Sequence, residues 1–323
     1  MIWLTWRQHR AQALAGLIGL GSLGVWLFVS HLGIARVFQS SGLASCLAAG
    51  HLDCSSPADV FNTHYQGLQF TVPLFLVVPL LVGLFWGAPL VAREIEHGTY
   101  RLVWTQGVTR RRWFSAKVAL IAGACAVGAA VFAELVTWWS ALFVRVGSDR
   151  LTPGVFDVRG IVPIAYVLFA LALGILAGTL IRRTVPAMAV TLGAFVGVRA
   201  VVSLLVRPHY LPAKTVSMPL FSQATSSADW ILRAATVDRA GNVISQGGGV
   251  DIGPLLSRCP GMAGLPKKSL IADCAHRLGL HQVITYQPGS RFWAFQGIES
   301  AIYIALAAGL IAVAMWTVRR RLA

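Results

Sequence analysis

Long apolar segments separated by shorter polar ones dominate this chain, and each apolar segment has the length of a membrane-spanning helix. Six segments fit the pattern, at residues 11–34, 70–92, 118–143, 161–181, 185–206 and 293–318. A helix of about 20 apolar residues crosses the hydrocarbon core of a bilayer. The pattern predicts an all-α polytopic membrane protein with six transmembrane helices, which places both termini on the same side of the membrane.

The first ten residues favour a helix that lies at the membrane surface. Trp3 and Trp6 have the spacing of an aromatic stripe on a helix. Arg7 and Arg10 have the same spacing and would form a basic stripe beside it, which suits the interface. A cleaved signal peptide is the alternative interpretation. Segment 11–34 is longer than a typical signal core, and no clear cleavage site follows it, which favours an uncleaved span.

Proline and tryptophan refine two of the spans. Segment 70–92 contains prolines in its interior, which predict a kinked helix. Such kinks are tolerated where neighbouring helices or water satisfy the freed backbone carbonyls. Segment 118–143 carries Trp138 and Trp139 near its outer end, where we expect both to anchor the helix at the membrane interface.

Composition agrees with a membrane protein. Of the 323 residues, 56% are hydrophobic and 12% are charged, and the mean hydropathy is +0.68. Globular domains carry about twice this charged fraction. The net charge of +15 could indicate nucleic-acid binding. The basic residues instead gather at the ends of the apolar segments, where topology and lipid headgroups account for them, so we expect membrane lipid and no nucleic acid as a partner.

The distribution of Lys and Arg predicts which face of the membrane is cytoplasmic. The two termini, segment 93–117 and the turn at residues 182–183 hold 13 of these residues, and the two short loops on the opposite face hold four. The positive-inside rule therefore places both termini in the cytoplasm. Residues 207–292, between the fifth and sixth spans, then form an extracellular segment that we call the cap.

Four of the five cysteines lie on the face predicted to be extracellular. Cys46 and Cys54 share the first outer loop, and Cys259 and Cys274 share the cap. Two pairs confined to this face predict two disulfides in an oxidising compartment. Unpaired cysteines are the alternative, and zinc is disfavoured because neither pair has the spacing of a zinc knuckle.

Local patterns in the cap predict a small fold with little regular sheet. Residues 236–244 have the pattern of a hairpin that turns at Gly241 and Asn242. Residues 267–278 place their apolar side chains on one face and predict a short helix closed by Gly279.

The polar segment 93–117, which we call the elbow, is the longest charged run between two spans. Residues 93–105 read R-E-I-E-H-G-T-Y-R-L-V-W-T, residues 108–110 read V-T-R, and residues 286–299, before and inside the last span, read Y-Q-P-G-S-R-F-W-A-F-Q-G-I-E. With the six-span order, these stretches resemble the permease subunits of ABC-2 type exporters, particularly single-domain permeases of actinobacteria. The resemblance covers essentially the whole chain, and the cap departs from it because many such permeases have only short re-entrant hairpins there.

The resemblance implies a subunit of the bacterial plasma membrane that does no chemistry of its own. It implies a homodimer, or a dimer with a sister permease, bound to two separate ATPase subunits that hold ATP and Mg²⁺. The elbow would dock in a cleft of each ATPase. ATP would then drive alternating access, with the first, second and fifth spans rearranging to release an apolar or amphipathic substrate, such as a drug, antibiotic, peptide or lipid.

The elbow residues themselves agree with a docking role. Carboxylates can pair with basic groups of a partner, glycine and threonine break the descending helix, and aromatic side chains anchor interfaces. Thr109 can cap the helix that follows. The predicted ATPase-coupling residues are Glu94, Glu96, Gly98, Thr99, Tyr100, Arg101, Leu102, Trp104, Thr109 and Arg110. A basic loop that only sets topology is the alternative, but it would not explain two aromatic residues.

Three ionisable residues fall inside predicted spans. Glu134, Arg199 and Glu299 each lie a few helical turns below the outer boundary of their span. Ionisable groups at such depth usually pair or face water. We expect the three to form a cluster that closes the outer end of the pathway. The alternative, left open by the sequence, is that the two glutamates merely reach the interface.

The sequence lacks the motifs of an enzyme. It contains no phosphate-binding G-x-x-x-x-G-K-[ST], no H-E-x-x-H and no G-x-S-x-G. We therefore expect no enzyme activity, no cofactor and no metal bound by this chain, with ATP hydrolysed by a partner. A secondary transporter, which usually needs carboxylates near the midplane and an internal repeat, is one rival. A membrane sensor or scaffold that uses the cap as a receptor is the other.

Overall fold

The computed structural model describes residues 2–49, 54–69, 71–97, 109–146, 150–219, 228–247 and 268–321. Within this part of the chain, six helical segments are long and apolar enough to cross a membrane, as predicted. They are Arg10–Ser40, Leu74–Glu96, Arg111–Trp139, Val162–Ile181, Thr184–His209 and Gly289–Arg320. The chain is therefore a multi-pass membrane protein.

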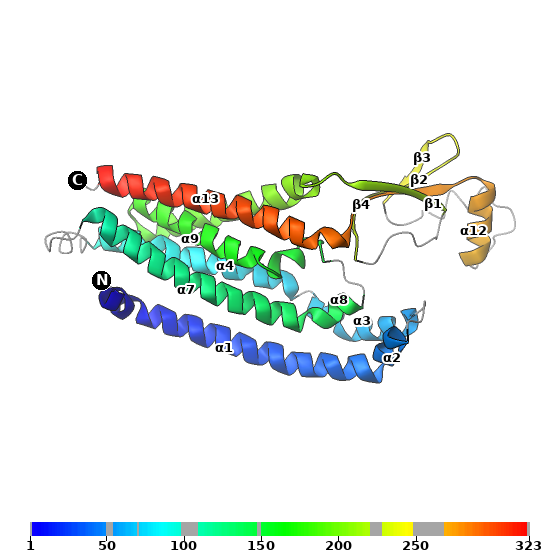
Figure 1. Cartoon of the computed structure of the whole chain (residues 1–323), viewed down its shortest axis with the longest axis horizontal. Helices are drawn as coiled ribbons and strands as arrows, with labels where there is room; N and C mark the ends of the chain where they lie inside the picture. The colour runs from blue at the N-terminus through cyan, green and yellow to red at the C-terminus, as the bar shows by residue number, and fades with distance from the viewer. Residues whose placement is uncertain are drawn as a thin grey trace.

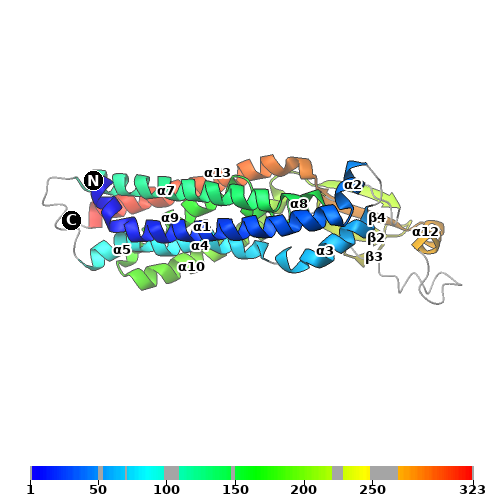
Figure 2. The same ribbon diagram turned by 90° about the horizontal axis from the view of Figure 1, so that it is seen from below.

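The bundle is elongated, and its two ends differ (Figure 1). The long helices α1 (Ile2–Ser40), α7 (Arg110–Trp139), α9 (Val162–Ile181) and α13 (Phe292–Arg321) run along the long axis. Both termini lie at one end, together with the two helix ends that flank the elbow (Figure 2). The sheet of the cap lies at the opposite end. We call these the elbow end and the cap end.

The second span is irregular, as its prolines predict. It consists of η1 (Val72–Leu76), α4 (Val77–Val82), the π-turn η2 (Gly83–Gly87) and α5 (Ala88–Glu96). Pro89 lacks an N–H to donate to the carbonyl of Phe85, four residues before it. The side-chain amide of Gln12, on α1, donates to that carbonyl oxygen at 3.3 Å. A neighbouring helix thus satisfies a group that proline leaves free.

Glycines let the second and fourth spans touch at the backbone. A Cβ added at Gly174 would stand 2.4 Å from the carbonyl oxygen of Gly83 and 2.6 Å from the nitrogen of Ala88. A Cβ at Gly178 would stand 2.5 Å from the carbonyl oxygen of Ala88. Small residues allow such approach between membrane helices. In contrast, no described atom lies within 4 Å of the corresponding position at Gly193.

The first outer loop is largely helical, although its sequence reads as a polar connection. It contains α2 (Leu43–Ala48) and α3 (Ser55–Gln69), and the predicted disulfide joins Cys46 to Cys54. Phe61 packs against Phe38 of α1, and both Phe61 and Tyr65 pack against Phe143 of the short helix α8 (Ala141–Arg145). Their spacing of four residues, which places both on one helix face, was the signal for this element.

The prediction that Trp139 anchors the membrane interface was wrong. Trp139 is fully buried, and its indole nitrogen donates to the hydroxyl of Ser30 at 2.8 Å. Trp138 remains partly exposed and stacks on Phe28 and His31 of α1. Adjacent helical residues point about 100° apart, so only one of the two indoles can face away from the bundle.

The fifth span begins after a tight turn and contains a π-turn of its own. Arg182 adopts a left-handed conformation, with φ of 61°, and ends α9. Three segments then follow one another: α10 (Thr184–Val201), the π-turn η4 (Val202–Val206) and the short η5 (Arg207–His209).

The chain is mostly helical, as predicted, but the expectation of little regular sheet in the cap was wrong. The described part of the cap forms a four-stranded antiparallel sheet in the order β1–β4–β2–β3, from β1 (Lys214–Pro219), β2 (Trp230–Val237), β3 (Val243–Gln246) and β4 (His281–Gln287). The edge strand β1 pairs with β4, from Lys214 opposite Tyr286 to Pro219 opposite His281. Because β1 follows the fifth span and β4 precedes α13, the two paired strands are each connected to a membrane helix by a short segment.

The local predictions within the cap are confirmed. Strands β2 and β3 form the expected hairpin, with Gly241 at φ of 83° in its turn. The carboxylate of Asp238 accepts bonds from the side chain and backbone of Asn242, which lowers the pKa of that carboxyl. Helix α12 (Lys268–Arg277) is followed by Gly279 at φ of 67°. Cys274 is disulfide-bonded, and its predicted partner Cys259 lies outside the described residues.

Candidate functional site

Four charged side chains meet inside the bundle at the cap end. Arg207 is fully buried, and its Nε and Nη2 donate to the two carboxylate oxygens of Glu299 at 2.8 and 2.7 Å. The same Nη2 also pairs with Asp157. Two parallel bonds of this kind fix the geometry of an arginine–carboxylate pair. Arg199 completes the group at 3.1 Å from Asp157 and 3.5 Å from Glu299. We call these four residues the ion network.

Two tyrosines extend the network. The hydroxyl of Tyr166 lies within hydrogen-bonding distance of both Asp157 and Glu299, and its single proton can go to either carboxylate. The guanidinium of Arg199 stacks on the ring of the same tyrosine, 3.8 Å from its centroid. Tyr210 donates to Glu299 at 3.1 Å. Every oxygen of the two carboxylates therefore has at least one donor.

The balance of charges explains how the network is tolerated where it lies. Two arginines face two carboxylates, so the group is neutral overall. Asp157, which precedes α9, is almost completely buried. Burial alone would raise the pKa of its carboxyl, but the charges of Arg199 and Arg207 outweigh burial and lower that pKa. Buried charges of this kind are retained where they are paired with good geometry.

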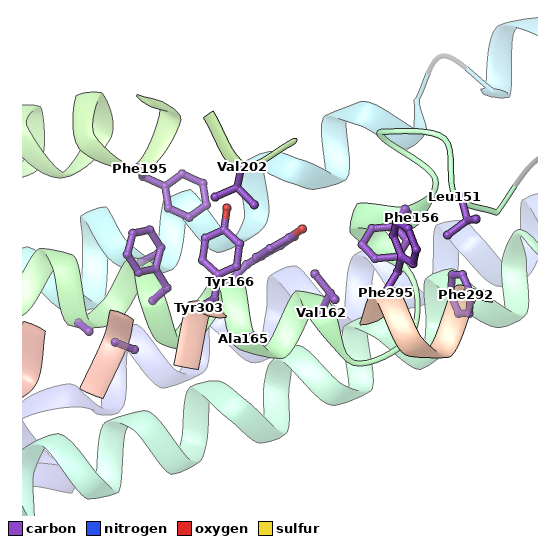
Figure 3. Close-up of a cluster of buried hydrophobic side chains, with 14 residues drawn as sticks. Leu151, Phe156, Val162, Ala165, Tyr166, Phe195, Val202, Phe292, Phe295 and Tyr303 are labelled. Carbon is purple, nitrogen blue, oxygen red and sulfur yellow. The ribbon is translucent and has the colours of Figure 1, made fainter. Parts of the chain in front are cut away.

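Aromatic residues surround the network. Figure 3 shows Tyr166 and Tyr303 beside Phe195 and Val202. A second group, toward the start of α13, includes Phe156 and Phe295. The guanidinium of Arg207 lies over the Phe156 ring, 4.5 Å from its centroid. These rings exclude water, which strengthens each ionic contact relative to a solvated one.

Two glutamines connect the network to the cap and to α9. The side-chain oxygen of Gln296 accepts from the backbone nitrogens of Ile161 and Val162, and so caps the start of α9. The side-chain nitrogen of Gln287, at the end of β4, donates to the carbonyl oxygens of Pro208 and Leu211. Both glutamines are fully buried. Residues of the 286–299 stretch therefore fasten the cap to the membrane helices.

The π-turn η4 brings the two arginines of the network to one face. Residues eight apart on a regular α-helix point about 80° away from each other, at about 100° per residue. A π-turn accommodates one additional residue. Arg199 and Arg207 then lie as if seven apart, within about 20° of alignment. A local departure from α-helix thus builds the ionic contact.

The predicted charge cluster is partly right. The structure brings Arg199 and Glu299 together, as predicted. Glu134 is exposed on α7, and within the described chain no ion pair joins it to the network. Asp157 and Arg207 take its place. Hydropathy assigned Asp157 to a polar loop and Arg207 to the cap, and the only signal for them was that charges flank the fourth and fifth spans.

The elbow end has polar contacts of its own. Glu94, on α5, pairs with Lys117, on α7. Glu96, the last residue of α5, accepts from the backbone nitrogen of Thr184 at 3.1 Å and from its hydroxyl at 2.8 Å. Both carboxylates therefore have partners within the chain, where the sequence favoured basic groups on another protein.

The start of α7 follows the prediction. Thr109 occupies the N-cap position, and its hydroxyl oxygen accepts from the backbone nitrogen of Arg112 at 3.4 Å. Helix α7 begins at Arg110. The other predicted coupling residues lie outside the described residues: Gly98, Thr99, Tyr100, Arg101, Leu102 and Trp104.

Comparison with known families decides what kind of protein carries these two ends. A family model described as ABC-2 membrane transporter related matches residues 17–207. The chain belongs to this family. It is an ABC-2 type permease, the membrane component of a transporter, and the family's membrane components are generally not catalytic themselves. No curated protein and no solved structure matches the chain.

The family match places the features described above in two groups. The matched residues of this ABC-2 permease include both flanks of the elbow and three members of the ion network, Asp157, Arg199 and Arg207. Glu299 and the sheet of the cap lie beyond the match. The cap end therefore combines residues inside the matched range with residues outside it.

Proposed function

We propose that this permease is the membrane subunit of an ATP-driven ABC exporter, which moves an apolar or amphipathic substrate outward across the bacterial plasma membrane. The observation that carries the proposal is the contrast between the two ends of the bundle. At the elbow end, the end of α5 and the start of α7 are tied to other spans, and the sequence between them is basic and partly aromatic. The cap end holds a neutral ion network in which each carboxylate oxygen accepts from at least one donor.

The proposed partners are ATPase subunits and a second permease copy. The sequence has no phosphate-binding loop, so ATP and Mg²⁺ would bind to separate ATPase subunits, two per transporter. A second permease copy, more readily an identical one than a sister chain, would complete the membrane domain. Both termini and the elbow would face the cytoplasm, because 13 basic residues gather there.

Transport would proceed by alternating access. ATP would draw the two ATPases together, and each would carry its docked elbow with it. The spans attached to the elbow would shift, the ion network beneath the cap would open, and the substrate would leave on the outer side. The substrate class is inferred from the apolar exposed faces of the spans.

Flux measurements separate this proposal from its rivals. We would co-express the chain with a candidate ATPase, prepare inside-out vesicles and measure uptake of fluorescent amphipathic dyes and a labelled lipid. The proposal predicts uptake that requires hydrolysable ATP and that is lost when the catalytic glutamate of the ATPase is replaced by glutamine. The control vesicles contain the ATPase without the permease.

Other outcomes would overturn the proposal. Uptake driven by a proton or sodium gradient without ATP would identify a secondary transporter. An ATPase complex without flux for any probe, in a preparation whose ATPase activity responds to additions on the cap side, would identify a sensor. The sensor alternative has one specific observation in its favour, which is that the cap sheet continues directly from two membrane helices.

A further inference from the structure

A carboxylate at the end of α5 caps the start of α10. Arg183 occupies the N-cap position of α10, and within the described contacts its side chain makes no capping bond. The capping oxygen instead comes from Glu96, which accepts from both the backbone nitrogen and the hydroxyl of Thr184. The helix that leads into the elbow thus holds the first residue of the fifth span.

Two properties of a helix N-terminus stabilise a carboxylate at this position. The first N–H groups of a helix have no partner within the helix. A negative charge there is also stabilised by the helix dipole. Glu96 supplies both the hydrogen-bond acceptor and the negative charge. Farther into the bundle, Ala88 of α5 belongs to the same buried cluster as Ala177 of α9 and Ala187 of α10. The end of α5 and the start of α10 therefore move most easily together.

The fifth span links this contact to the cap end. Between its two ends, α10 exposes much of its surface, including Val190, Leu192 and Val196. Its strong polar contacts lie at the extremes, with Thr184 at the elbow end and Arg199 and Arg207 at the cap end. Between these ends, Phe195 of α10 stacks on Phe169 of α9, so α10 is held along its length and would carry a displacement from one end to the other as one body.

We propose that Glu96 is a positioning residue that passes displacement of the elbow to α10 and, through α10, to the ion network beneath the cap. This inference rests on the proposed function, because the elbow is displaced only if an ATPase binds it. It assigns Glu96 an internal partner, Thr184, as the contact through which it acts.

The test measures movement at the cap end, with ATPase binding measured separately. Spin labels are placed on cysteines introduced at Leu204 and Val29, which are exposed on η4 and α1. Cys125, the free cysteine of the described chain, is replaced by alanine. The permease–ATPase complex is reconstituted in nanodiscs, and the distance between the labels within one chain is measured without nucleotide and with trapped ATP.

The proposal predicts a nucleotide-dependent change in the distance distribution, reduced to less than half by Glu96→Ala. Glu96→Gln should retain most of the change, because its amide oxygen still accepts from Thr184. Thr184→Ser, which keeps both donors, should also retain it. Glu134→Ala is the matched control, since it removes an exposed glutamate that takes part in neither the Glu96–Thr184 contact nor the ion network, and it should leave the change intact. The ATPase should co-purify equally with all variants.

Two results would overturn the proposal while leaving the proposed function in place. One is a full change in Glu96→Ala with the ATPase bound, and the other is no change in the wild-type complex. Failure of the ATPase to bind the wild-type permease would instead remove the proposed function, and the inference would fall with it. Loss of ATPase binding in Glu96→Ala alone would make Glu96 a docking residue and would also contradict the proposal.

Discussion

Arg207 is the residue on which the cap end depends most. Its guanidinium donates to both carboxylates of the network and lies against an aromatic ring, with no exposure to solvent. Removing one partner of a buried ion pair leaves an uncompensated charge, which typically costs about 3–5 kcal/mol. Replacing both partners with apolar groups costs much less. The network should therefore tolerate paired changes better than single ones.

We predict that Arg207→Leu destabilises the cap end by about 3–5 kcal/mol. Chemical unfolding in detergent, followed by tryptophan fluorescence, measures the effect. Arg145→Leu is the control, because Arg145 is exposed on α8 (Ala141–Arg145). Combining Arg207→Leu with Glu299→Leu should recover part of the loss. Two results would contradict the network as described. One is an equal loss of stability in Arg145→Leu, and the other is a double variant whose loss equals the sum of the losses of the two single variants.

Asp157 gives the network a predictable response to acid. Its carboxyl has a lowered pKa in the folded chain, and an unfolded aspartate titrates near pH 3.9. The stability that it contributes is therefore present above about pH 4 and is lost as the pH falls through the lowered value. Hydrogen exchange of Tyr166 and its neighbours should stay constant from pH 7 to about pH 5 after correction for intrinsic rates. Asp157→Asn should remove the acid-dependent loss, and an unchanged acid response would contradict this role.

Sequence alone could identify some residues of the network and not others. Arg199 and Glu299 stood out because a charge inside an apolar span has few explanations. Asp157 and Arg207 did not, because each lies at the edge of a span where charges are common. Their involvement depends on the π-turn and on the approach of α9, α10 and α13, which no local pattern encodes.

At the scale of elements, irregular helix segments and close contacts determine how the spans fit together. The π-turn η4 aligns two arginines, and glycines let α9 contact the second span at the backbone. The hairpin of β2 and β3 and the helix α12 were predictable because their signals are local. The pairing of β1 with β4 was not, because it joins residues 214 and 286 through the intervening cap.

The π-turn can be tested by changing the number of residues between the two arginines. Inserting one alanine after Ser203 should rotate Arg207 by about 100° relative to Arg199. We expect a loss of stability similar to that of Arg207→Leu, and little further loss when the two changes are combined, because both remove the same contacts. Deleting Ser203 is the control, because it should leave a regular α-helix with the two arginines seven residues apart and still aligned, and so should cost less. Equal losses in the insertion and the deletion would show that the π-turn does not serve the network.

The glycine contact gives a second test with an internal control. Gly174→Ala should destabilise the chain by about 1–3 kcal/mol, because its Cβ would collide with the backbone of the second span. Gly193→Ala adds a methyl group where no described atom lies nearby, and alanine favours the helix, so stability should be unchanged or higher. Unfolding by denaturing detergent compares the two. Similar losses in both variants would contradict the contact.

At the scale of the whole molecule, the chain is a permease whose two ends differ in structure. Both termini and the elbow flanks lie at one end, and the cap and the ion network lie at the other (Figures 1 and 2). The six spans and their order could be predicted from hydropathy, and the family was visible in the elbow motif. The sheet of the cap and its attachment to the spans could not, since they arise from pairing between distant segments.

The central claim is that the elbow of this permease binds an ATPase, and co-purification tests it most directly. The chain, tagged alone, is co-expressed with the ATPase encoded nearest to it and purified into lipid nanodiscs, where ATP hydrolysis is measured. We predict a stable complex with ATPase activity. Tyr100→Asp and Trp104→Asp should each reduce binding at least tenfold, while Trp138→Asp, at the other end of α7, should not. The account would be contradicted if the permease co-purified with none of several candidate ATPases, or if neither elbow substitution reduced binding.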